Sequence, residues 1–431
     1  MLDIAFIREH RELLQRTADG KNIPLSIQEL LELDEKRRES LREIERLRHE
    51  RNRLSERIGQ LIGKGERQAA ESVKREVKFT NNALAELEAE YARIASDFQA
   101  MMLLVPNPVS PDTPDGKSDK ENVEIRREGE PPAFDFKPRD HVELGEMLGI
   151  IDIPRGVKIG GTRNYVLKGA GFRLHRAVQH LAMDVLEQKG FTPMDVPMLV
   201  RDDALVHSGF FPLGREQIFE LPEDGKYLIG TSEVSLVSYF SGEIIDVSEP
   251  VRLAAATACF RREIGSAGRD VHGLYRVHQF SKVEQVVFCK NDPELSEQLL
   301  QDITRNAEEI VRLLELPYRV MSVCIGDMGQ KTYKQYDIEV WMPSRQAYGE
   351  THSSSNLHDF QARRANIRYR DEAGKLVFCH TLNNTAIASP RILIPLLENH
   401  QRADGSVYIP KALRPYMGGI EEIQPSVAPK R

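Results

Sequence analysis

The segment 260–284 combines charged and aromatic residues in a pattern that suits nucleotide binding. It begins with FRRE at 260–263, continues through a glycine-rich stretch, and ends with VHQF at 277–280 and the acid Glu284. This pattern predicts two strands joined by a long loop. A guanidinium at the end of the first strand can pair with a phosphate, and a ring in the second can stack on a base. A plain hairpin with an Arg–Glu salt bridge would have the same composition.

Two further segments combine hydroxyl groups with acids. Residues 227–239 place Thr231-Ser232-Glu233 after an apolar strand, which is also the composition of a helix N-cap with a nearby acid. Residues 336–364 run from an alternating strand into Tyr348-Gly349-Glu350, and a serine-rich turn follows. Taken alone, the serine-rich stretch is typical of a loop.

These segments resemble the signature motifs of the class II aminoacyl-tRNA synthetases, and in detail those of the seryl-tRNA synthetases. FRxE, a glycine-rich loop and RVHQFxKVE resemble motif 2, and HTLNNTAIASPRILIPLLENHQ at 380–401 resembles motif 3. The helix expected over 170–189, Gly190 and the strand 191–200 resemble motif 1, which builds the dimer interface in that family. The resemblance extends over nearly the whole chain.

The resemblance implies an ATP site built by motifs 2 and 3. Arg261 would contact the α-phosphate and Phe280 would stack on adenine. Arg391 would contact ATP on the opposite side and reach the γ-phosphate. The ATP-binding residues that the resemblance implies are Arg261, Arg262, Glu263, Val277, Phe280, Glu350, Thr351, His352, Ser353 and Arg391.

A magnesium ion is expected to accompany ATP, with Glu350 as its candidate ligand and Ser353 as a further candidate. The reaction would be attack of the serine carboxylate on the α-phosphorus, with pyrophosphate leaving. Because negative charge builds on the phosphoryl oxygens, catalysis would be mainly electrostatic stabilisation and positioning. The catalytic residues expected are Arg261, Glu350 and Arg391.

L-Serine is the amino acid that the resemblance implies. The residues expected to bind it are Thr231, Ser232, Glu233, Glu284 and Thr385. A site that pairs with a hydroxyl rejects analogues lacking it, because its own polar groups would be left without partners. Which acid holds the ammonium and which the hydroxyl is left open by the sequence.

Four residues depart from the family pattern. His352 stands where the family usually has serine, and Asn384 and Pro390 replace usual glycines. We expect His352 to be a hydrogen-bonding loop residue rather than a base. We also expect Ser389 to cap a helix that has Pro390 at its first position. Pro395 should kink that helix.

The first 104 residues predict an antiparallel helical hairpin. Apolar residues recur at heptad spacing from Leu33 to Leu61 and again from Val73 to Met101, with Gly63-Lys64-Gly65 between the two series. Residues 36–78 carry 14 Lys and Arg against 8 Asp and Glu, a balance of +6 in a chain whose net charge is −7. A basic segment on an acidic protein favours contact with nucleic acid.

The hairpin could instead be a dimerisation coiled coil or a solvated strut. Residues 36–78 contain no Phe, Tyr or Trp on which bases could stack, so recognition would be of RNA shape and backbone. The family resemblance implies such a role, with the hairpin holding the long variable arm of tRNA(Ser). The candidate tRNA contacts are Arg38, Arg42, Arg46, Arg53 and Arg57.

The fold class expected is α+β, with a helical hairpin and a class II catalytic domain whose antiparallel sheet is flanked by helices. The expected boundaries are 1–104 for the hairpin arm, 105–138 for a linker, 139–419 for the catalytic domain and 420–431 for a disordered tail.

Composition favours a cytoplasmic protein without a membrane partner. No apolar run has the length of a membrane span, and the N-terminus lacks a signal-peptide pattern. The four cysteines are isolated in sequence, so we expect reduced thiols, no zinc and no disulfide framework.

The expected activity is ATP-dependent ligation of L-serine to tRNA(Ser) through a seryl-adenylate, by a homodimer. Where a tRNA(Sec) exists, it would be a second acceptor. One alternative is a paralogue that activates an amino acid for another acceptor, but such relatives lack the long hairpin. The other is an inactive, tRNA-binding regulator, against which the charged residues of the motifs argue.

Overall fold

The computed structural model describes residues 1–265 and 272–425. The chain divides into two compact units, Met1–Pro106 and Asn107–Arg431. Each unit is described by itself below.

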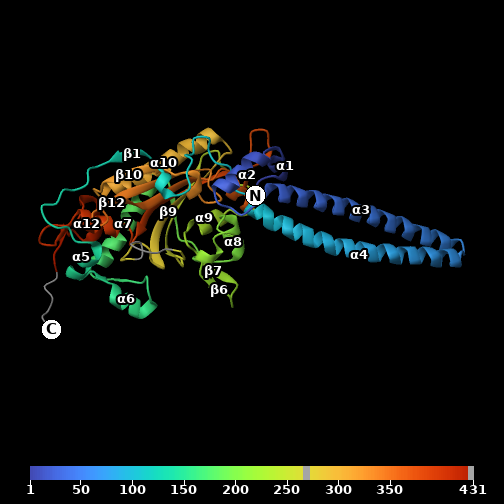
Figure 1. The fold of residues 1–431 in the computed structure, drawn as a ribbon, viewed down its shortest axis with the longest axis horizontal. Coiled ribbons are helices and arrows are strands. Elements are labelled where there is room, and N and C mark those ends of the chain that lie inside the picture. Colours follow the sequence, from blue (N-terminus) through green and yellow to red (C-terminus); the bar gives the residue numbers. More distant parts are fainter. Residues whose placement is uncertain (266–271, 426–431) are drawn as a thin grey trace. The chain divides into compact units, whose positions relative to one another are not determined.

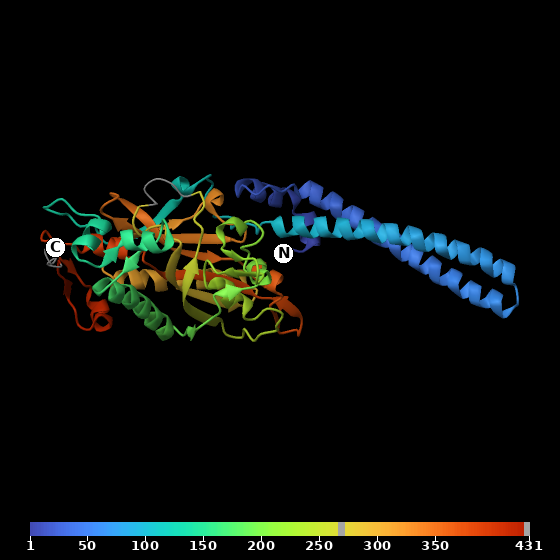
Figure 2. The same ribbon diagram turned by 90° about the horizontal axis from the view of Figure 1, so that it is seen from below.

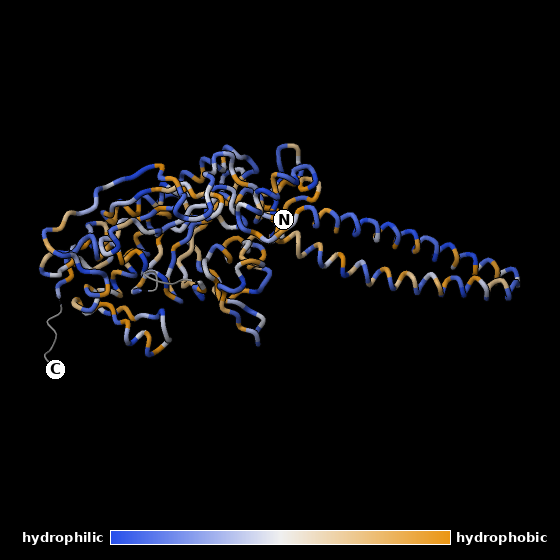
Figure 3. The backbone as a smooth tube through the Cα atoms, in the orientation of Figure 1, coloured by the Kyte–Doolittle hydropathy of each residue, from blue (hydrophilic) through white to orange (hydrophobic). Residues whose placement is uncertain are grey.

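The first unit is the helical hairpin predicted from the heptads (Figure 1). The Ser26 hydroxyl caps the first long helix by accepting a hydrogen bond from the Glu29 N–H at 3.2 Å. Ile44, Leu54, Val73 and Leu84 are buried where the two helices face each other. Figure 3 shows hydrophilic and hydrophobic residues alternating along both helices. The helices are α1(Ile4–Glu9), α2(Arg11–Gly20), α3(Ile27–Gly63) and α4(Arg67–Leu104).

The hairpin has a small apolar core at its base. Side chains of α1 and α2 pack there against the start of α3 and the end of α4, and Ile7, Leu14, Leu30 and Met102 are all buried. This core gives the first unit a hydrophobic centre of its own, apart from the long coiled-coil seam.

The second unit is built on an eight-stranded sheet with the strand order β1-β10-β11-β12-β15-β9-β8-β4 (Figures 1 and 2). Every neighbouring pair is antiparallel except β4 and β8, which are parallel. The strands are β1(Val123–Glu128), β4(Thr192–Met194), β8(Val251–Phe260), β9(Gln279–Cys289), β10(Tyr318–Ser322), β11(Lys334–Met342), β12(Ala347–Asn356) and β15(His380–Ser389).

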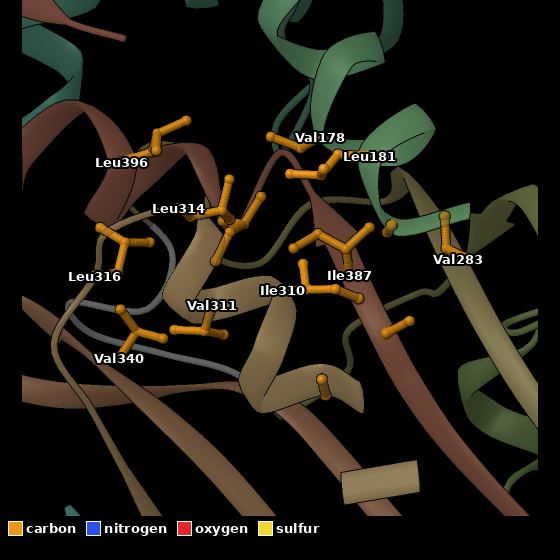
Figure 4. Packing of buried hydrophobic residues seen from close by; sticks show 14 of the residues in the cluster. Val178, Leu181, Val283, Ile310, Val311, Leu314, Leu316, Val340, Ile387 and Leu396 are labelled. Atoms are coloured by element: carbon orange, nitrogen blue, oxygen red, sulfur yellow. The ribbon is translucent and has the colours of Figure 1, made fainter. Parts of the chain in front are cut away.

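Two long helices, α7(Ala170–Gln188) and α10(Pro293–Leu313), pack on one face of this sheet. Figure 4 shows Val178 of α7 and Ile310 and Val311 of α10 gathered around Ile387 of β15. All four side chains are buried in the largest apolar cluster of the protein. The amphipathic helix expected over 170–189 is therefore confirmed, and Gly190 follows it with φ 82°, a conformation that glycine adopts without strain.

Shorter elements complete the second unit. The helices are α5(His141–Met147), α6(Ile153–Gly160), α8(Asp202–His207), α9(Glu233–Ser238), α11(Phe360–Ala365) and α12(Leu393–Asn399), with 3₁₀ turns at Asp119–Glu121, Arg215–Gln217, Ile325–Asp327 and Lys411–Met417. The small strands are β2(Ile151–Asp152), β3(Val166–Leu167), β5(Leu199–Val200), β6(Glu220–Leu221), β7(Lys226–Leu228), β13(Arg368–Arg370), β14(Leu376–Phe378), β16(Val407–Tyr408) and β17(Glu422–Ile423). Within the described ranges, no helix has the length and apolar character needed to cross a membrane.

The structure differs from the sequence expectations at both ends of the catalytic unit. The expected linker 105–138 contains β1, which pairs with β10 at the edge of the main sheet. Most of its side chains are exposed and charged, as is usual for an edge strand, so its sequence resembles a loop. In the expected tail 420–431, β17 pairs with β16, whereas residues 426–431 lie outside the described part of the chain.

Three local expectations around the motifs were wrong. The serine-rich stretch after Glu350 is not a turn but the second half of β12. The helix after motif 3 begins at Leu393, so Ser389 and Pro390 precede it and do not form its cap and first position. Pro395 falls in the first turn of α12, where a backbone N–H has no intrahelical acceptor, so the expected loss of a helical hydrogen bond does not arise.

Candidate active site

A cavity of about 420 Å³ lies on the face of the sheet opposite α10. On β9 the side chains of Phe280, Lys282 and Glu284 line it, whereas Gln285 donates to the Ile303 carbonyl of α10. This division follows from the alternation of side chains along a strand. The two segments that resemble motifs 2 and 3 thus contribute to the same cavity.

Irregularities in two strands adjust which side chains reach the cavity. A bulge in β12 shifts its register with β11 between Glu350 and His352, so that Glu350, Thr351 and Ser353 all line the cavity. In β15 the register with β9 shifts after Thr385, which also lines the cavity.

One end of the cavity is a carboxylate surrounded by donors. Glu233, at the start of α9, is buried, and one of its oxygens accepts hydrogen bonds from the Asn383 amide at 2.5 Å and the Gln361 amide at 2.7 Å. The same oxygen forms an ion pair with the Lys331 ammonium. Thr231, two residues before Glu233, also lines this end.

A second carboxylate, Glu284, lies near the first. It is buried and forms an ion pair with Lys282 at 2.5 Å, and the Thr385 hydroxyl donates to it at 3.3 Å. Burial raises the pKa of Glu284 above its ordinary value, and the negative charge of Glu233 adds to this, while the Lys282 ammonium opposes it. An acid and a hydroxyl in contact form a small polar recess.

The other end of the cavity carries guanidinium and aromatic groups. Arg261 follows β8, is held by a hydrogen bond from Nε to the Gly230 carbonyl at 3.1 Å, and lies 5.4 Å from the centre of the Phe280 ring. Arg391 donates to the carbonyl of Tyr275 at 3.1 Å and lies 4.5 Å from the centre of the Tyr275 ring. Two fixed cations beside aromatic rings that line the cavity suit a nucleoside triphosphate.

The Glu350 carboxylate lies beside the Arg391 guanidinium and near two further acids, Asp337 and Asp327. The Arg391 guanidinium lies 3.6 Å from the Glu350 carboxylate. Burial raises the pKa of Asp337 well above its ordinary value, and the charge of Glu350 adds to the effect; the pKa of Asp327 is raised in the same way, by burial first. A cation placed here would relieve this concentration of negative charge.

These donors fit magnesium only when a substrate supplies further ligands. No group of three His, Cys, Asp or Glu side chains within residues 1–265 and 272–425 is arranged to hold a metal ion. Magnesium is commonly bound by one or two carboxylates together with the phosphates of its substrate. Glu350, with Ser353 next to it on the cavity wall, meets that requirement.

Three of the expected site residues do not line the cavity. Ser232 is fully buried and contacts the Ala255 carbonyl, while Arg262 is exposed and its backbone N–H donates to Gln217. His352 is buried within β12, not on a loop, and shares a hydrogen bond with the Thr351 hydroxyl at 2.7 Å. Burial lowers the pKa of His352 to about 3, so it stays neutral and cannot serve as a base near neutral pH.

The remaining expected residues, Glu263 and Val277, line the cavity, and Arg276 pairs with Glu263 at 3.2 Å. Residues 266–271 of the glycine-rich stretch between β8 and β9 lie outside the described residues.

Asn384 has a structural explanation that the sequence did not reveal. Its amide donates to the Ser354 hydroxyl of β12 at 2.6 Å, and its oxygen accepts from Gln285 of β9 at 2.6 Å. Gln285 in turn accepts from Asn306 of α10 at 3.0 Å. The side chain that replaces the usual glycine therefore joins three adjacent strands in a buried network.

Several cavity residues were not expected from the sequence. Asn383 lies within the motif 3 segment, and Lys282 within the motif 2 segment, so an inspection of polar residues at alternate positions could have found both. Tyr275 stacks against Arg391, and Lys331 approaches Glu233 from a segment without a recognisable motif.

The five candidate RNA-contacting arginines are exposed along α3 but differ in their partners. Arg38 pairs with Asp34 at 3.2 Å, and Arg46 pairs with Glu43 and Glu50. Arg42 donates to the Arg38 carbonyl, whereas Arg53 and Arg57 form no ion pair within the described part of the chain. The arginines nearer the turn are thus the more available for a phosphate backbone.

Comparison with known proteins covers both units. Residues 1–109 match the family model for the seryl-tRNA synthetase N-terminal domain, and residues 218–400 match that for the tRNA synthetase class II core domain (G, H, P, S and T). A curated relative, the serine–tRNA ligase of Deinococcus radiodurans, is 46% identical over 422 residues, which cover 98% of each chain.

Two solved structures share the whole fold. The crystal structure of seryl-tRNA synthetase from Pyrococcus horikoshii complexed with ATP aligns with a TM-score of 0.89 and 38% identity, covering 99% of this chain and 100% of that one. The cytoplasmic serine–tRNA ligase of Naegleria fowleri in complex with AMP aligns with a TM-score of 0.84 and 26% identity, covering 99% of each.

Proposed function

The chain belongs to the seryl-tRNA synthetase family, and from this we propose that it joins L-serine to tRNA(Ser), using ATP, through a seryl-adenylate. One observation carries the proposal: a single cavity has two buried acids with a threonine at one end and two guanidinium groups with aromatic rings at the other. An amino acid and ATP bound at these ends would lie side by side.

We assign the substrate hydroxyl to Glu284 and Thr385, and its ammonium to Glu233. The contact between Glu284 and Thr385 offers both an acceptor and a hydroxyl to a small alcohol. Glu233 accepts hydrogen bonds from two amides and forms an ion pair with an ammonium, so the structure already shows this carboxylate receiving the kind of group that the substrate would bring.

Arg261 and Arg391 are assigned to ATP. The serine carboxylate attacks the α-phosphorus, the bond to the bridging oxygen breaks, and pyrophosphate leaves. Both guanidiniums are held by backbone carbonyls, so they can stabilise the developing charge on the phosphoryl oxygens without reorganising. Magnesium bound with ATP, held by Glu350 and Ser353, would neutralise part of the phosphate charge.

The proposed partners beyond the substrates are tRNA(Ser) and a second copy of the chain. The basic hairpin is the proposed tRNA contact, with Arg53 and Arg57 available to phosphates. We propose that homodimers form through the segment of α7 and β4, where Phe172 is 56% exposed on the first turn of α7. We also propose a cytoplasmic location, where tRNA(Ser) would be charged.

Replacing Thr385 by valine tests the assignment of the hydroxyl. Thr385→Val keeps the side-chain shape but leaves Glu284 without its hydroxyl partner. We expect kcat/KM for serine in ATP–pyrophosphate exchange to fall about 10- to 100-fold, and the preference for serine over alanine to fall with it. Thr304→Val is the matched control, since this buried threonine bonds to the Leu300 carbonyl within α10. An unchanged serine-to-alanine ratio in Thr385→Val would contradict the assignment.

A further inference from the structure

Lys331 brings a protein ammonium to the carboxylate that we assign to the ammonium of serine. It lies between β10 and β11, 98 residues from Glu233, and forms an ion pair with one of the Glu233 oxygens. Its side chain is 18% exposed and that of Glu233 is 6% exposed. The pair is thus largely removed from water but can still be reached from the cavity, which both residues line.

The oxygen that Lys331 contacts is fully engaged. It also accepts hydrogen bonds from Gln361 and Asn383, at 2.7 and 2.5 Å. The substrate ammonium would have to share this carboxylate with Lys331 or replace it. Two ammonium groups at one buried carboxylate leave an excess positive charge with little solvent to screen it, so replacement is favoured.

The backbone around Lys331 is held in place. The Asn107 amide donates to the Lys331 carbonyl at 3.0 Å and to the Leu357 carbonyl at 2.8 Å, and the Asn107 N–H donates to Gln330 at 3.0 Å. The exchange of ammonium groups must therefore be a movement of the Lys331 side chain. The ring of Phe210, 5.2 Å from its nitrogen, offers the cation a favourable neighbour after it leaves Glu233.

The other lysine of the cavity is placed differently. Lys282 and its partner Glu284 are two residues apart on the same strand, and both side chains are almost fully buried. Lys282 is therefore a fixed part of the wall, whereas Lys331 reaches its acid from a separate segment with a partly exposed side chain.

We propose that Lys331 is a displaceable counter-ion of the amino-acid subsite. It neutralises Glu233 in the free enzyme and gives way to the ammonium of the incoming serine. An analogue without an ammonium cannot replace it, because Glu233 would lose its cation. This inference rests on the proposed function, in which Glu233 receives the substrate ammonium.

The test compares Lys331→Met, which keeps most of the length of the side chain and removes its charge, with Lys331→Arg, which keeps the charge. Serine binding to Lys331→Met no longer has to break an ion pair. We expect its KM for serine in ATP–pyrophosphate exchange to fall about 5- to 20-fold, with the KM for ATP unchanged. Lys331→Arg should keep the wild-type KM for serine.

Thermal unfolding gives a second, independent readout. Free Lys331→Met has a buried carboxylate that keeps its two amide donors but lacks a cation, so its Tm should lie below that of the wild type, and serine should raise its Tm by more than it raises the wild-type Tm. Lys331→Gln serves the same comparison if Lys331→Met does not fold.

A serine KM that rises in the uncharged variants would overturn the inference and make Lys331 a ligand of the substrate carboxylate. An unchanged serine KM would overturn it as well. Failure of the proposed function is distinguished by the wild-type protein, which would then show no exchange with serine at all.

Discussion

Arg391→Ala is expected to lower the rate of serine-dependent ATP–pyrophosphate exchange by about 10²- to 10³-fold, with a smaller effect on the KM for serine. The guanidinium of Arg391 is held by the Tyr275 carbonyl, the Glu350 carbonyl and the Tyr275 ring. It is therefore a pre-positioned cation at the end of the cavity that we assign to the triphosphate, where charge would change during adenylate formation. The alanine variant leaves the Glu350 carboxylate without this neighbouring cation.

Arg345→Ala is the matched control for this variant. Arg345 also stacks on the Tyr275 ring, at 3.8 Å from its centre, but it does not line the cavity. Its removal should leave the exchange rate close to that of the wild type. Exchange by Arg391→Ala at nearly the wild-type rate would remove Arg391 from the ATP site.

Removal of the hairpin should separate the two half-reactions completely. In a protein lacking residues 36–92, with a short glycine bridge, we expect charging of tRNA(Ser) to be lost and serine-dependent exchange to persist. All described residues lining the cavity belong to the second unit, so adenylate formation does not need the hairpin. Charging is expected to need the basic helices, because phosphate contacts dominate nucleic-acid affinity.

The cut points preserve the base of the first unit. Arg37 lies 4.6 Å from the centre of the Phe98 ring, which shows that α3 and α4 are adjacent near the cut. The apolar cluster that includes Ile7, Leu30 and Met102 remains intact. Persisting exchange is the internal control for folding. Charging of tRNA(Ser) at the wild-type rate by the shortened protein would refute the role of the hairpin.

The parts of the fold that sequence could predict are those with a strong local signal. The heptads of α3 and α4 form their buried seam within the hairpin itself, so their period is visible without knowledge of the rest of the protein. The amphipathic face of α7 and the alternation along β9 are visible for the same reason.

The errors arose where tertiary contacts override local composition. The polar second half of β12 resembles a loop, but it pairs with β11 and β15, and its side chains have partners, such as Ser354 with Asn384 and Asn356 with Ser296. The position of Lys331 could not be predicted at all. Its ion pair with Glu233 joins segments distant in sequence, and the Asn107 amide that donates to its carbonyl comes from a third segment.

The site shows the same division. Phe280, Lys282 and Glu284 occupy alternate positions of one strand, so their common orientation follows from sequence once the strand is recognised. In a regular strand, Glu350 and His352 would face the same side of the sheet, opposite to Thr351. The bulge in β12 interrupts this alternation between Glu350 and His352, so the orientation of Glu350 could not be predicted from spacing.

The central claim is tested most directly by ATP–pyrophosphate exchange of the wild-type protein with each of the twenty amino acids, without tRNA. The account predicts exchange with serine and not with the other nineteen, because the recess of Glu284 and Thr385 requires a small hydroxyl and Glu233 requires an ammonium. Exchange with a different amino acid, or with none, would contradict the assignment of this cavity to seryl-adenylate formation.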